Sequence, residues 1–439
     1  MKRKIEAVVS AWLEAKDGRP LLIKGPRRVG KTYIAKEYLA GVIGPGHVVY
    51  LDFQTDLQGL ESLFAGRSDV GRIVGDLELY LGRSIDSASD VLVFDEVQLC
   101  DKALNSLRFF AQSDYRVIAT GSLLGVTLSK YRQDGRRLPF PSDVRHVSMH
   151  PMDFEEFLWA LGQESMAQGI RTCYEQARPY PRHEEALSFY RQYLVVGGMP
   201  RAVASYAASA SSEEVREVQS EIDQTYVADM PMAQAALCRA IWDSVPRQLA
   251  REGTRKFKYA DVARGGRANR FEEPLDWLES AGIISLNRQT NSCELPLQAR
   301  DGGAFFKAYM ADTGLMYYKF GLAPNLLLMP ESYSALSAAF RGALAENYVM
   351  QQLEANGVRT YYWTPGDASG EIEFLTSTSR GDLLPIEVKS GENVRSRSLK
   401  SFMAKTSCPL GLRVSAREFG QEGSLKSIPL YAAFCIEPS

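Results

Sequence analysis

The segment Gly25-Pro-Arg-Arg-Val-Gly30-Lys31-Thr32 constrains the fold of this chain more than any other feature. It fits the pattern GxxxxGK[ST], directly follows the apolar run 21–23, and precedes a helical pattern over 33–39. A strand, a glycine-rich turn and a helix in this order are typical of a P-loop, whose backbone N–H groups curl toward phosphates. The sequence therefore predicts a nucleotide site on a parallel α/β sheet.

Each residue type in this turn has a chemical reason. We expect Lys31 to face the β and γ phosphates and the Thr32 hydroxyl to complete a Mg²⁺ shell, so ATP and Mg²⁺ are the expected ligands. The expected contact residues are Gly25, Pro26, Arg27, Arg28, Val29, Gly30, Lys31, Thr32 and Tyr33.

Short apolar runs recur along the first 150 residues, with room for helices between them. After 21–23 they lie at 48–53, 91–94, 116–120 and 144–149. Strands that alternate with helical patterns predict a parallel sheet. Residues 1–150 are therefore expected to form the P-loop ATPase core.

Two adjacent carboxylates end the third of these runs, Val91-Leu-Val-Phe94-Asp95-Glu96. Asp95 is expected to hold Mg²⁺ directly or through water, and Glu96 to orient or deprotonate the attacking water. Lys31, Asp95 and Glu96 are thus the predicted catalytic residues. The next run ends in Thr120-Gly-Ser122, and either hydroxyl could reach the γ phosphate or the water; an ordinary turn is the alternative.

Arg132, Arg136 and Arg137 precede the last run of the core. They could touch the nucleotide of a neighbouring subunit in a homo-oligomer, or form a solvated loop.

The remainder of the chain changes character after Pro151. Helical periodicity dominates 151–250, which we interpret as a helical lid or linker. Residues 251–303 resemble a helix-turn-helix with a wing, the wing being suggested by Gly282-Ile-Ile-Ser. A helix around 341–354 and two alternating strands, 371–375 and 384–389, predict a further α/β domain over 304–439. The expected fold class is therefore multidomain α/β.

Composition narrows the functional classes. The net charge is -2, so nucleic-acid binding would need a local basic patch. No apolar run is long enough for a membrane span, and the first residues indicate an amphipathic helix instead of a signal peptide. The 6 cysteines form no CxxC pair, which argues against a disulfide framework or a zinc site. We expect reduced thiols and a cytoplasmic protein.

With these residues in place, the chain resembles predicted prokaryotic AAA+-like ATPases that carry a C-terminal domain of unknown function. The likeness spans nearly the whole chain and implies ATP binding. Besides the P-loop and the strand ending in Asp95 and Glu96, the matching signatures are Pro151-Met-Asp-Phe-Glu-Glu-Phe157, Gly197-Gly198-Met199-Pro200, Asp276-Trp277, Asp312-Thr-Gly314-Leu315, Gly342-Ala-Leu-Ala-Glu346-Asn347 and Pro385-Ile-Glu387-Val-Lys389. Several of these also suit purely structural roles: the Gly197 motif as a helix break, and Asp312 as a helix cap.

The C-terminal strands carry a second set of carboxylates. Alternation places Glu371 and Glu373 on one face of their strand, and Glu387 beside Lys389 on the next. With Glu346 from the preceding helix, this set resembles a PD-(D/E)xK nuclease-like, restriction-endonuclease-like core, in which acids bind Mg²⁺ and the lysine steadies the attacking hydroxide. Glu373 stands where that pattern usually has Asp. Glu373 and Glu387 are thus a candidate second metal site; the alternative is a binding domain whose charges form ion pairs.

Basic residues gather in two places. The first group lies within 251–270, with lysine or arginine at positions 251, 255, 256, 258, 264, 267 and 270. The second group follows the last predicted strand, with lysine or arginine at positions 395, 397, 400 and 405. Such clusters are typical of contacts with a phosphate backbone, although pairing with acidic surfaces of neighbouring domains would also explain them.

Two functions are consistent with the whole sequence. The first is a Mg²⁺-dependent ATPase coupled to DNA binding or processing. The alternative is a nucleotide-dependent signalling switch that binds a protein partner and has no nuclease activity.

Overall fold

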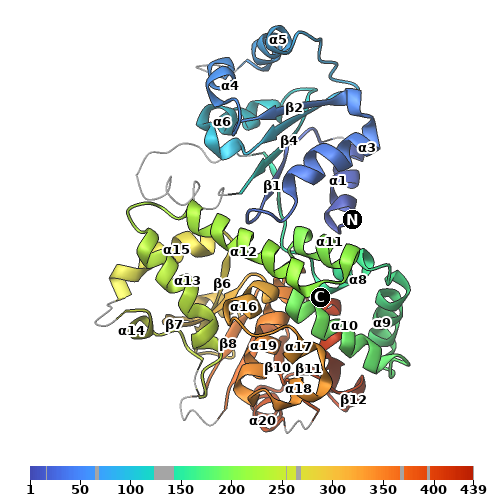
Figure 1. Cartoon of the computed structure of the whole chain (residues 1–439), viewed down its shortest axis with the longest axis vertical. Coiled ribbons are helices and arrows are strands. Elements are labelled where there is room, and N and C mark those ends of the chain that lie inside the picture. Colours follow the sequence, from blue (N-terminus) through green and yellow to red (C-terminus); the bar gives the residue numbers. More distant parts are fainter. Residues whose placement is uncertain are drawn as a thin grey trace. The chain divides into compact units, whose positions relative to one another are not determined.

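A computed structural model of the 439 residues describes residues 1–15, 17–64, 69–122, 143–253, 255–263, 268–365, 370–392 and 396–438, without the side chains of 299–304. The chain divides into two compact units (Figure 1). We call residues 2–150 with 280–282 the N-terminal unit, and 151–279 with 283–439 the C-terminal unit.

A five-stranded sheet forms the centre of the N-terminal unit. Its order is β2-β3-β4-β1-β5, and each neighbouring pair is parallel. The bounds are β1 Leu21–Lys24, β2 Val48–Asp52, β3 Val91–Asp95, β4 Arg116–Gly121 and β5 Arg145–Ser148. All five lie on the predicted apolar runs, so the predicted parallel sheet is confirmed. The carboxyl ends of parallel strands share one edge, where ligands bind in such folds.

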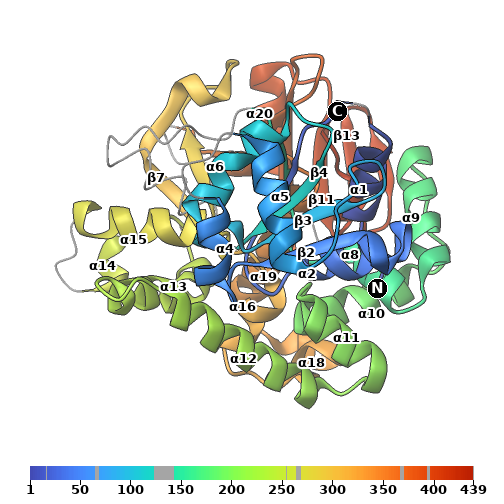
Figure 2. The same ribbon diagram turned by 90° about the horizontal axis from the view of Figure 1, so that it is seen from above.

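Helices bury the faces of this sheet. One face packs its residues Leu51, Phe94 and Ala119 against α4 (Leu57–Leu63), α5 (Val70–Leu81) and α6 (Asp101–Phe110) in a single apolar cluster. Figure 2 shows these three helices next to one another. The alternate residues Ile23, Val93 and Ile118 are buried as well, on the other face of their strands.

The helical stretch after β1 contacts β2, β3 and β4. It consists of α2 (Lys31–Tyr33), a π-helical turn (Ile34–Tyr38) and α3 (Leu39–Ile43), and α1 (Ile5–Glu14) precedes the sheet. Short 3₁₀ turns lie at Pro45–His47 and Val97–Leu99.

Helices fill the start of the C-terminal unit, as predicted. Their bounds are α8 Phe154–Ala160, α9 Glu164–Gln176, α10 His183–Val196, α11 Pro200–Ser209, α12 Ser212–Asp229, α13 Ala235–Leu249, α14 Tyr259–Val262 and α15 Ala268–Ser280. Five more follow later in the chain: α16 Thr313–Lys319, α17 Asn325–Leu328, α18 Pro330–Ala335, α19 Ala338–Ala355 and α20 Arg397–Thr406. Nearly every residue of α19 from Ala343 to Leu353 is buried, which makes it the central helix of this unit.

An eight-stranded mixed sheet lies beside these helices, in the order β12-β13-β11-β10-β9-β8-β6-β7. Its bounds are β6 Ile284–Thr290, β7 Asp301–Met310, β8 Tyr361–Trp363, β9 Ile372–Ser377, β10 Leu383–Val388, β11 Gly411–Ser415, β12 Gly420–Glu422 and β13 Leu425–Pro429. This unit also contains two 3₁₀ turns, Leu297–Arg300 and Leu430–Cys435.

The segment expected to be a wing belongs to this C-terminal sheet. β6 pairs antiparallel with β7 and parallel with β8, so it lies inside the sheet. β7 also runs across the expected boundary between residues 303 and 304. The winged-helix prediction is therefore not confirmed, because pairing with β8 draws the hairpin into the larger sheet.

Two of the sequence signatures meet in the core of the C-terminal unit. Asp312 caps α16 by accepting from Leu315 N at 2.8 Å, and it also accepts from Gly198 N at 2.6 Å. Gly197 ends α10 with a φ of 75°. The cap and the helix break expected from these motifs are thus both present, and one carboxylate joins them.

The 6 cysteines are unpaired, and all except Cys293 are buried. No helix in the described ranges is both long and apolar enough to cross a bilayer.

The tight contact at Gly198 gives a stability prediction. A Cβ at this position would lie 2.0 Å from the Met152 carbonyl oxygen, so Gly198→Ala should destabilise the protein by more than about 2 kcal/mol. A Cβ at Gly420 meets nothing within 4 Å, so Gly420→Ala should stay within about 0.5 kcal/mol. Denaturant unfolding measures both; equal losses would contradict the packing described here.

Candidate functional site

The P-loop joins β1 to α2 through three residues with positive φ. Gly25 has φ 156°, Arg28 has φ 68° and Gly30 has φ 97°. A Cβ at Gly25 would lie 2.1 Å from the Met149 carbonyl oxygen, so only glycine fits there. The loop therefore turns sharply between a buried strand and a helix, as the motif predicts.

Lys31 occupies the inside of this loop. Its side chain is 4% exposed, and Nζ donates to the carbonyl oxygens of Gly25 at 3.0 Å and Pro26 at 2.8 Å. Burial lowers the pKa of Lys31 to about 8, against the attraction of Glu96 and Asp95. The loop carbonyl oxygens thus hold the ammonium, and both carboxylates attract it.

The Asp95 carboxylate collects hydroxyl groups from three segments. Thr32 Oγ1 donates to Oδ2 at 2.9 Å, Tyr50 OH donates to Oδ2 at 2.6 Å, and Thr120 Oγ1 donates to Oδ1. Thr32 and Asp95, the predicted Mg²⁺ ligands, therefore lie together. Their oxygens suit a hard divalent cation, so they would hold Mg²⁺, which would supply positive charge against the nucleotide phosphates.

Tyr50 was not predicted from the sequence. Tyr50 lies two residues before Asp52 on β2, and Asp52 is the register partner of Asp95 in the parallel β2–β3 pair. Strand alternation therefore puts Tyr50 and Asp95 on one face, and this spacing was the signal that could have found it.

Glu96 begins the turn after β3 with φ 53°. Its Oε2 accepts from Ser122 Oγ at 2.7 Å and from Gln98 Nε2 at 2.5 Å. Burial acts to raise the pKa of Glu96, but these hydrogen bonds and the charge of Lys31 outweigh it and leave the pKa below its usual value. Glu96 is therefore an ionised carboxylate beside the loop, in contact with the predicted Ser122.

The other predicted contact residues lie in or beside the loop. Pro26 and Val29 are buried, Arg27 is half-buried, and Arg28 and Tyr33 are exposed. Arg132, Arg136 and Arg137 lie outside the described residues.

The predicted C-terminal carboxylates also come together, but basic side chains separate them. Lys307 Nζ lies 2.8 Å from Glu346 Oε1 and pairs with Glu371 as well. Arg255 pairs with the other oxygen of Glu346. Lys389 Nζ lies 3.5 Å from Glu373 Oε1 and 3.4 Å from Glu387 Oε1. The predicted association of Glu373, Glu387 and Lys389 is thus present as ion pairs.

These pairs set the charge state of the cluster. Burial would raise the pKa of Glu346, but Lys307 and Arg255 outweigh it and hold that pKa well below its usual range. Burial raises the pKa of Glu373 to about 7. Among the described residues, no group of three or more His, Cys, Asp or Glu side chains is arranged to hold a metal ion.

Several basic side chains of the segment 251–270 form contacts within the protein. Arg251 pairs with Asp261 at 2.6 Å, Arg255 with Glu346, and Lys256 Nζ lies 4.8 Å from the Phe305 ring centroid. Lys258 and Arg270 are exposed, whereas Arg264 and Arg267 lie outside the described residues.

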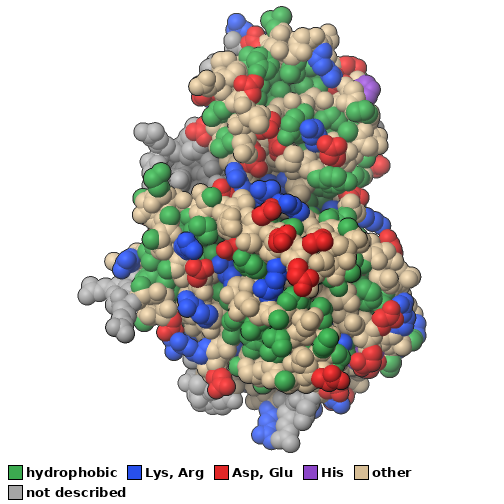
Figure 3. All heavy atoms as spheres, viewed as in Figure 1, with side chains coloured by type: hydrophobic (Ala, Val, Ile, Leu, Met, Phe, Trp, Pro, Cys, Tyr) green, Lys and Arg blue, Asp and Glu red, His purple; other side chains and the backbone are tan. Residues whose placement is uncertain are grey.

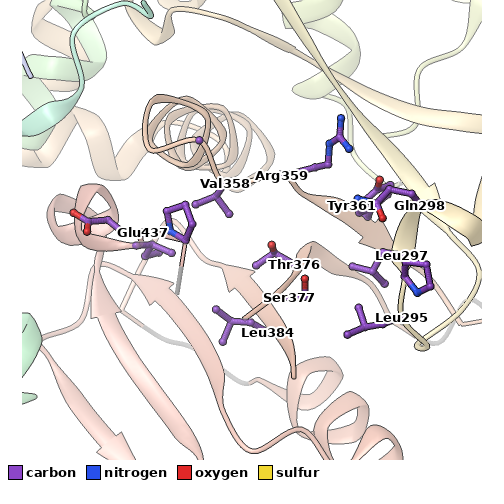
Figure 4. A pocket seen from close by; sticks show the side chains of 14 residues that line it. Leu295, Leu297, Gln298, Val358, Arg359, Tyr361, Thr376, Ser377, Leu384 and Glu437 are labelled. Atoms are coloured by element: carbon purple, nitrogen blue, oxygen red, sulfur yellow. The ribbon is translucent and has the colours of Figure 1, made fainter. Parts of the chain in front are cut away.

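A cavity of about 310 Å³ lies elsewhere in the C-terminal unit (Figure 4). Leu295, Leu297, Val358 and Leu384 surround it in this view. An adjoining cavity of about 550 Å³ shares the lining residue Arg359. None of the predicted site residues lines either space.

Comparison with known families identifies the N-terminal unit. Residues 17–158 match the AAA domain family. Residues 188–326 and 341–431 match two domains of unknown function, DUF8612 and DUF4143. No curated protein matches the chain. The chain therefore contains an AAA-type P-loop ATPase domain, and the predicted ATP hydrolase is confirmed at that level.

Two solved structures are similar over much of the chain. The Walker-type ATPase PABY2304 of Pyrococcus abyssi is 15% identical, with a TM-score of 0.46, and the match covers 73% of this chain and 95% of that one. The Aeropyrum pernix ORC2 protein, in its ADPNP–ADP complexes, is 13% identical, with a TM-score of 0.39, covering 75% and 91%. Because the identities and TM-scores are this low, these similarities do not indicate which ligands or partners this chain binds.

Tyr50 is expected to position Asp95 without touching the nucleotide. Tyr50→Phe removes one donor to a carboxylate, so kcat should fall about tenfold while ATP affinity changes little. Tyr38→Phe is the matched control, because Tyr38 OH bonds to Ser10 and the Glu6 carbonyl oxygen, away from Asp95. Equal kcat in Tyr50→Phe and the wild type would remove Tyr50 from the site.

The lowered pKa of Lys31 predicts a pH dependence of nucleotide binding. Below pH 8 the ammonium is charged and can bind phosphates; above it the free protein loses this charge, so ATP affinity should fall by up to tenfold per pH unit. Calorimetric titration from pH 6.5 to 9.5 measures this. Lys31→Arg should bind with a flat profile, since arginine stays charged. A flat wild-type profile would contradict the burial effect.

Proposed function

We propose that this chain is a Mg²⁺-dependent ATPase that works as a nucleotide-controlled switch, and that its C-terminal unit binds a protein partner without cutting nucleic acid. The observation that carries the ATPase part is the contact of Thr32 with Asp95 at 2.9 Å, beside Glu96 and Lys31. Cation, metal ligands and base thus meet at one edge of a sheet.

Each of these groups has a place in phosphoryl transfer. Lys31 would bind the β and γ phosphates, and Thr32 with Asp95 would hold Mg²⁺. Glu96, ionised and half-buried beside the loop, would orient the attacking water and accept its proton. These assignments use groups that already lie together, so hydrolysis needs no large rearrangement of the sheet.

The switch part follows from the partners of Glu96. Ser122 donates to Glu96 from the end of β4, and Gln98 donates from the turn before α6. A water or γ phosphate that engages Glu96 competes with these two donors. Nucleotide state would therefore alter the contacts of two segments that lead away from the site.

The charge arrangement in the C-terminal unit supports a binding role over a nuclease role. Glu346 and Glu371, two of the four clustered acids, are paired with Lys307, and Arg255 also pairs with Glu346. Acids paired in this way are poor ligands for a catalytic metal ion.

DNA is the second candidate for the bound partner. Lys258, Arg270 and Arg397 are exposed and have no ion pair within the described ranges. Acidic side chains are nevertheless interspersed with basic ones on the face in Figure 3. The protein partner is therefore the preferred proposal.

Nucleotide turnover tests the ATPase assignment. Glu96→Gln should keep ATP binding and lose at least about 100-fold in turnover, because the amide keeps the shape and cannot accept the proton. Lys31→Ala should lose binding, and Glu37→Gln, an exposed carboxylate after the loop, should behave as the wild type. Normal turnover in Glu96→Gln would remove its proposed role.

Adding duplex or single-stranded DNA to the same assay separates the two partners. The protein-binding proposal expects unchanged turnover and no salt-dependent DNA affinity. Stimulation that disappears in a Lys258, Arg270 and Arg397 triple alanine variant would instead establish the DNA-coupled function.

A further inference from the structure

The carboxylate cluster of the C-terminal unit contains its own cation. Lys307 lies on β7, and its side chain is 0% exposed. Its ammonium contacts Glu346 of α19 and Glu371, which directly precedes β9. Lys307 thus lies between the helix acid Glu346 and Glu371, so its ammonium occupies the side of the carboxylate cluster that Glu346 faces.

The neighbouring groups hold Lys307 in this place. Tyr309 OH donates to Glu346 Oε1 at 2.6 Å, on the same oxygen that Lys307 contacts. Lys307 Nζ also lies 5.4 Å from the centroid of the Tyr362 ring. Arg255 engages the second oxygen of Glu346. Both oxygens of this carboxylate are therefore occupied by donors.

The residues present do not fit a divalent ion on the full set of four acids. Glu373 and Glu387 are the two acids of this set that Lys307 does not pair with, and Lys389 Nζ lies within 3.5 Å of a carboxylate oxygen of each. Glu387 Oε2 is buried without a hydrogen-bond partner among the described residues, so one acceptor stays unused. An ammonium beside two carboxylates opposes a second cation, and Mg²⁺ demands several oxygen ligands in strict geometry.

We propose that Lys307 is a built-in substitute for a metal ion: its ammonium bridges Glu346 and Glu371, and the C-terminal unit therefore binds no divalent metal at this cluster. This inference deepens the proposed non-nuclease role of the C-terminal unit. It is independent of the ATPase assignment, because the experiment below uses nucleotide-free protein and no turnover.

Manganese titration of the full chain, followed by the EPR signal of free Mn²⁺, tests the proposal. Nucleotide-free wild type should show no site at this cluster with a Kd below about 1 mM, and Glu387→Gln should leave the titration unchanged. Lys307→Met keeps the chain length and removes the charge, so it should bind Mn²⁺ at least tenfold more tightly. The double variant Lys307→Met with Glu346→Gln should lose that gain.

A largely buried lysine away from the cluster supplies the control. Lys319 lies 2.9 Å from Asp223 Oδ1 and 2.7 Å from Asp243 Oδ1, with a side chain 9% exposed. Lys319→Met removes a comparable pair of contacts away from the cluster and should not gain Mn²⁺ binding. An equal gain in both variants would contradict a specific role for Lys307.

Thermal unfolding adds a readout that does not depend on metal. Lys307→Met leaves buried carboxylates uncompensated, so the unfolding midpoint should fall by about 6–10 °C, and Glu346→Gln in that background should restore part of it. If Lys307→Met fails to fold, the titration of the wild type still tests whether the cluster binds a divalent metal ion. Tight wild-type Mn²⁺ binding that is lost in Glu387→Gln would overturn the proposal.

Discussion

The Asp95 carboxylate is the interaction on which the N-terminal unit depends. It accepts hydrogen bonds from Thr32 after β1, Tyr50 on β2 and Thr120 on β4. These groups can meet only because β3 lies between β2 and β4, and β1 lies beside β4. The order of the strands therefore determines the geometry of the site, and a changed strand order would separate the loop 25–32 from Asp95.

Charge compensation has the corresponding role in the C-terminal unit. The acids of the central helix α19 and of the adjacent strands are buried, and Lys307, Arg255 and Lys389 balance most of their charge. Removing one member of a buried pair costs more than the pair contributes, because the other charge stays in a medium of low polarity. The network thus joins α19 and β7 to the start of β9, and it accounts for the polar core of this unit.

The sequence predicts the N-terminal unit well because each strand is an apolar run and the loop carries a motif with a defined chemistry. Thr32, Asp95, Glu96 and Ser122 were predicted in this way, and in the structure Thr32 contacts Asp95 and Ser122 contacts Glu96. Tyr50 was missed because a single aromatic residue on a strand belongs to no motif. Lys307 was missed because an isolated lysine normally indicates a solvated position, and only the pairing of β7 with β6 brings it to the acids. Counting charges over 251–270 likewise could not reveal that Arg255 pairs with Glu346.

We infer that nucleotide state in the N-terminal unit controls the C-terminal unit. Hydrogen exchange measured by mass spectrometry on Glu96→Gln, with ATP and Mg²⁺ or with ADP, tests it most directly, since slowed hydrolysis holds the ATP state. We expect exchange differences between the two nucleotide states in peptides of the C-terminal unit as well as around 25–32. Differences confined to the N-terminal unit would contradict the switch.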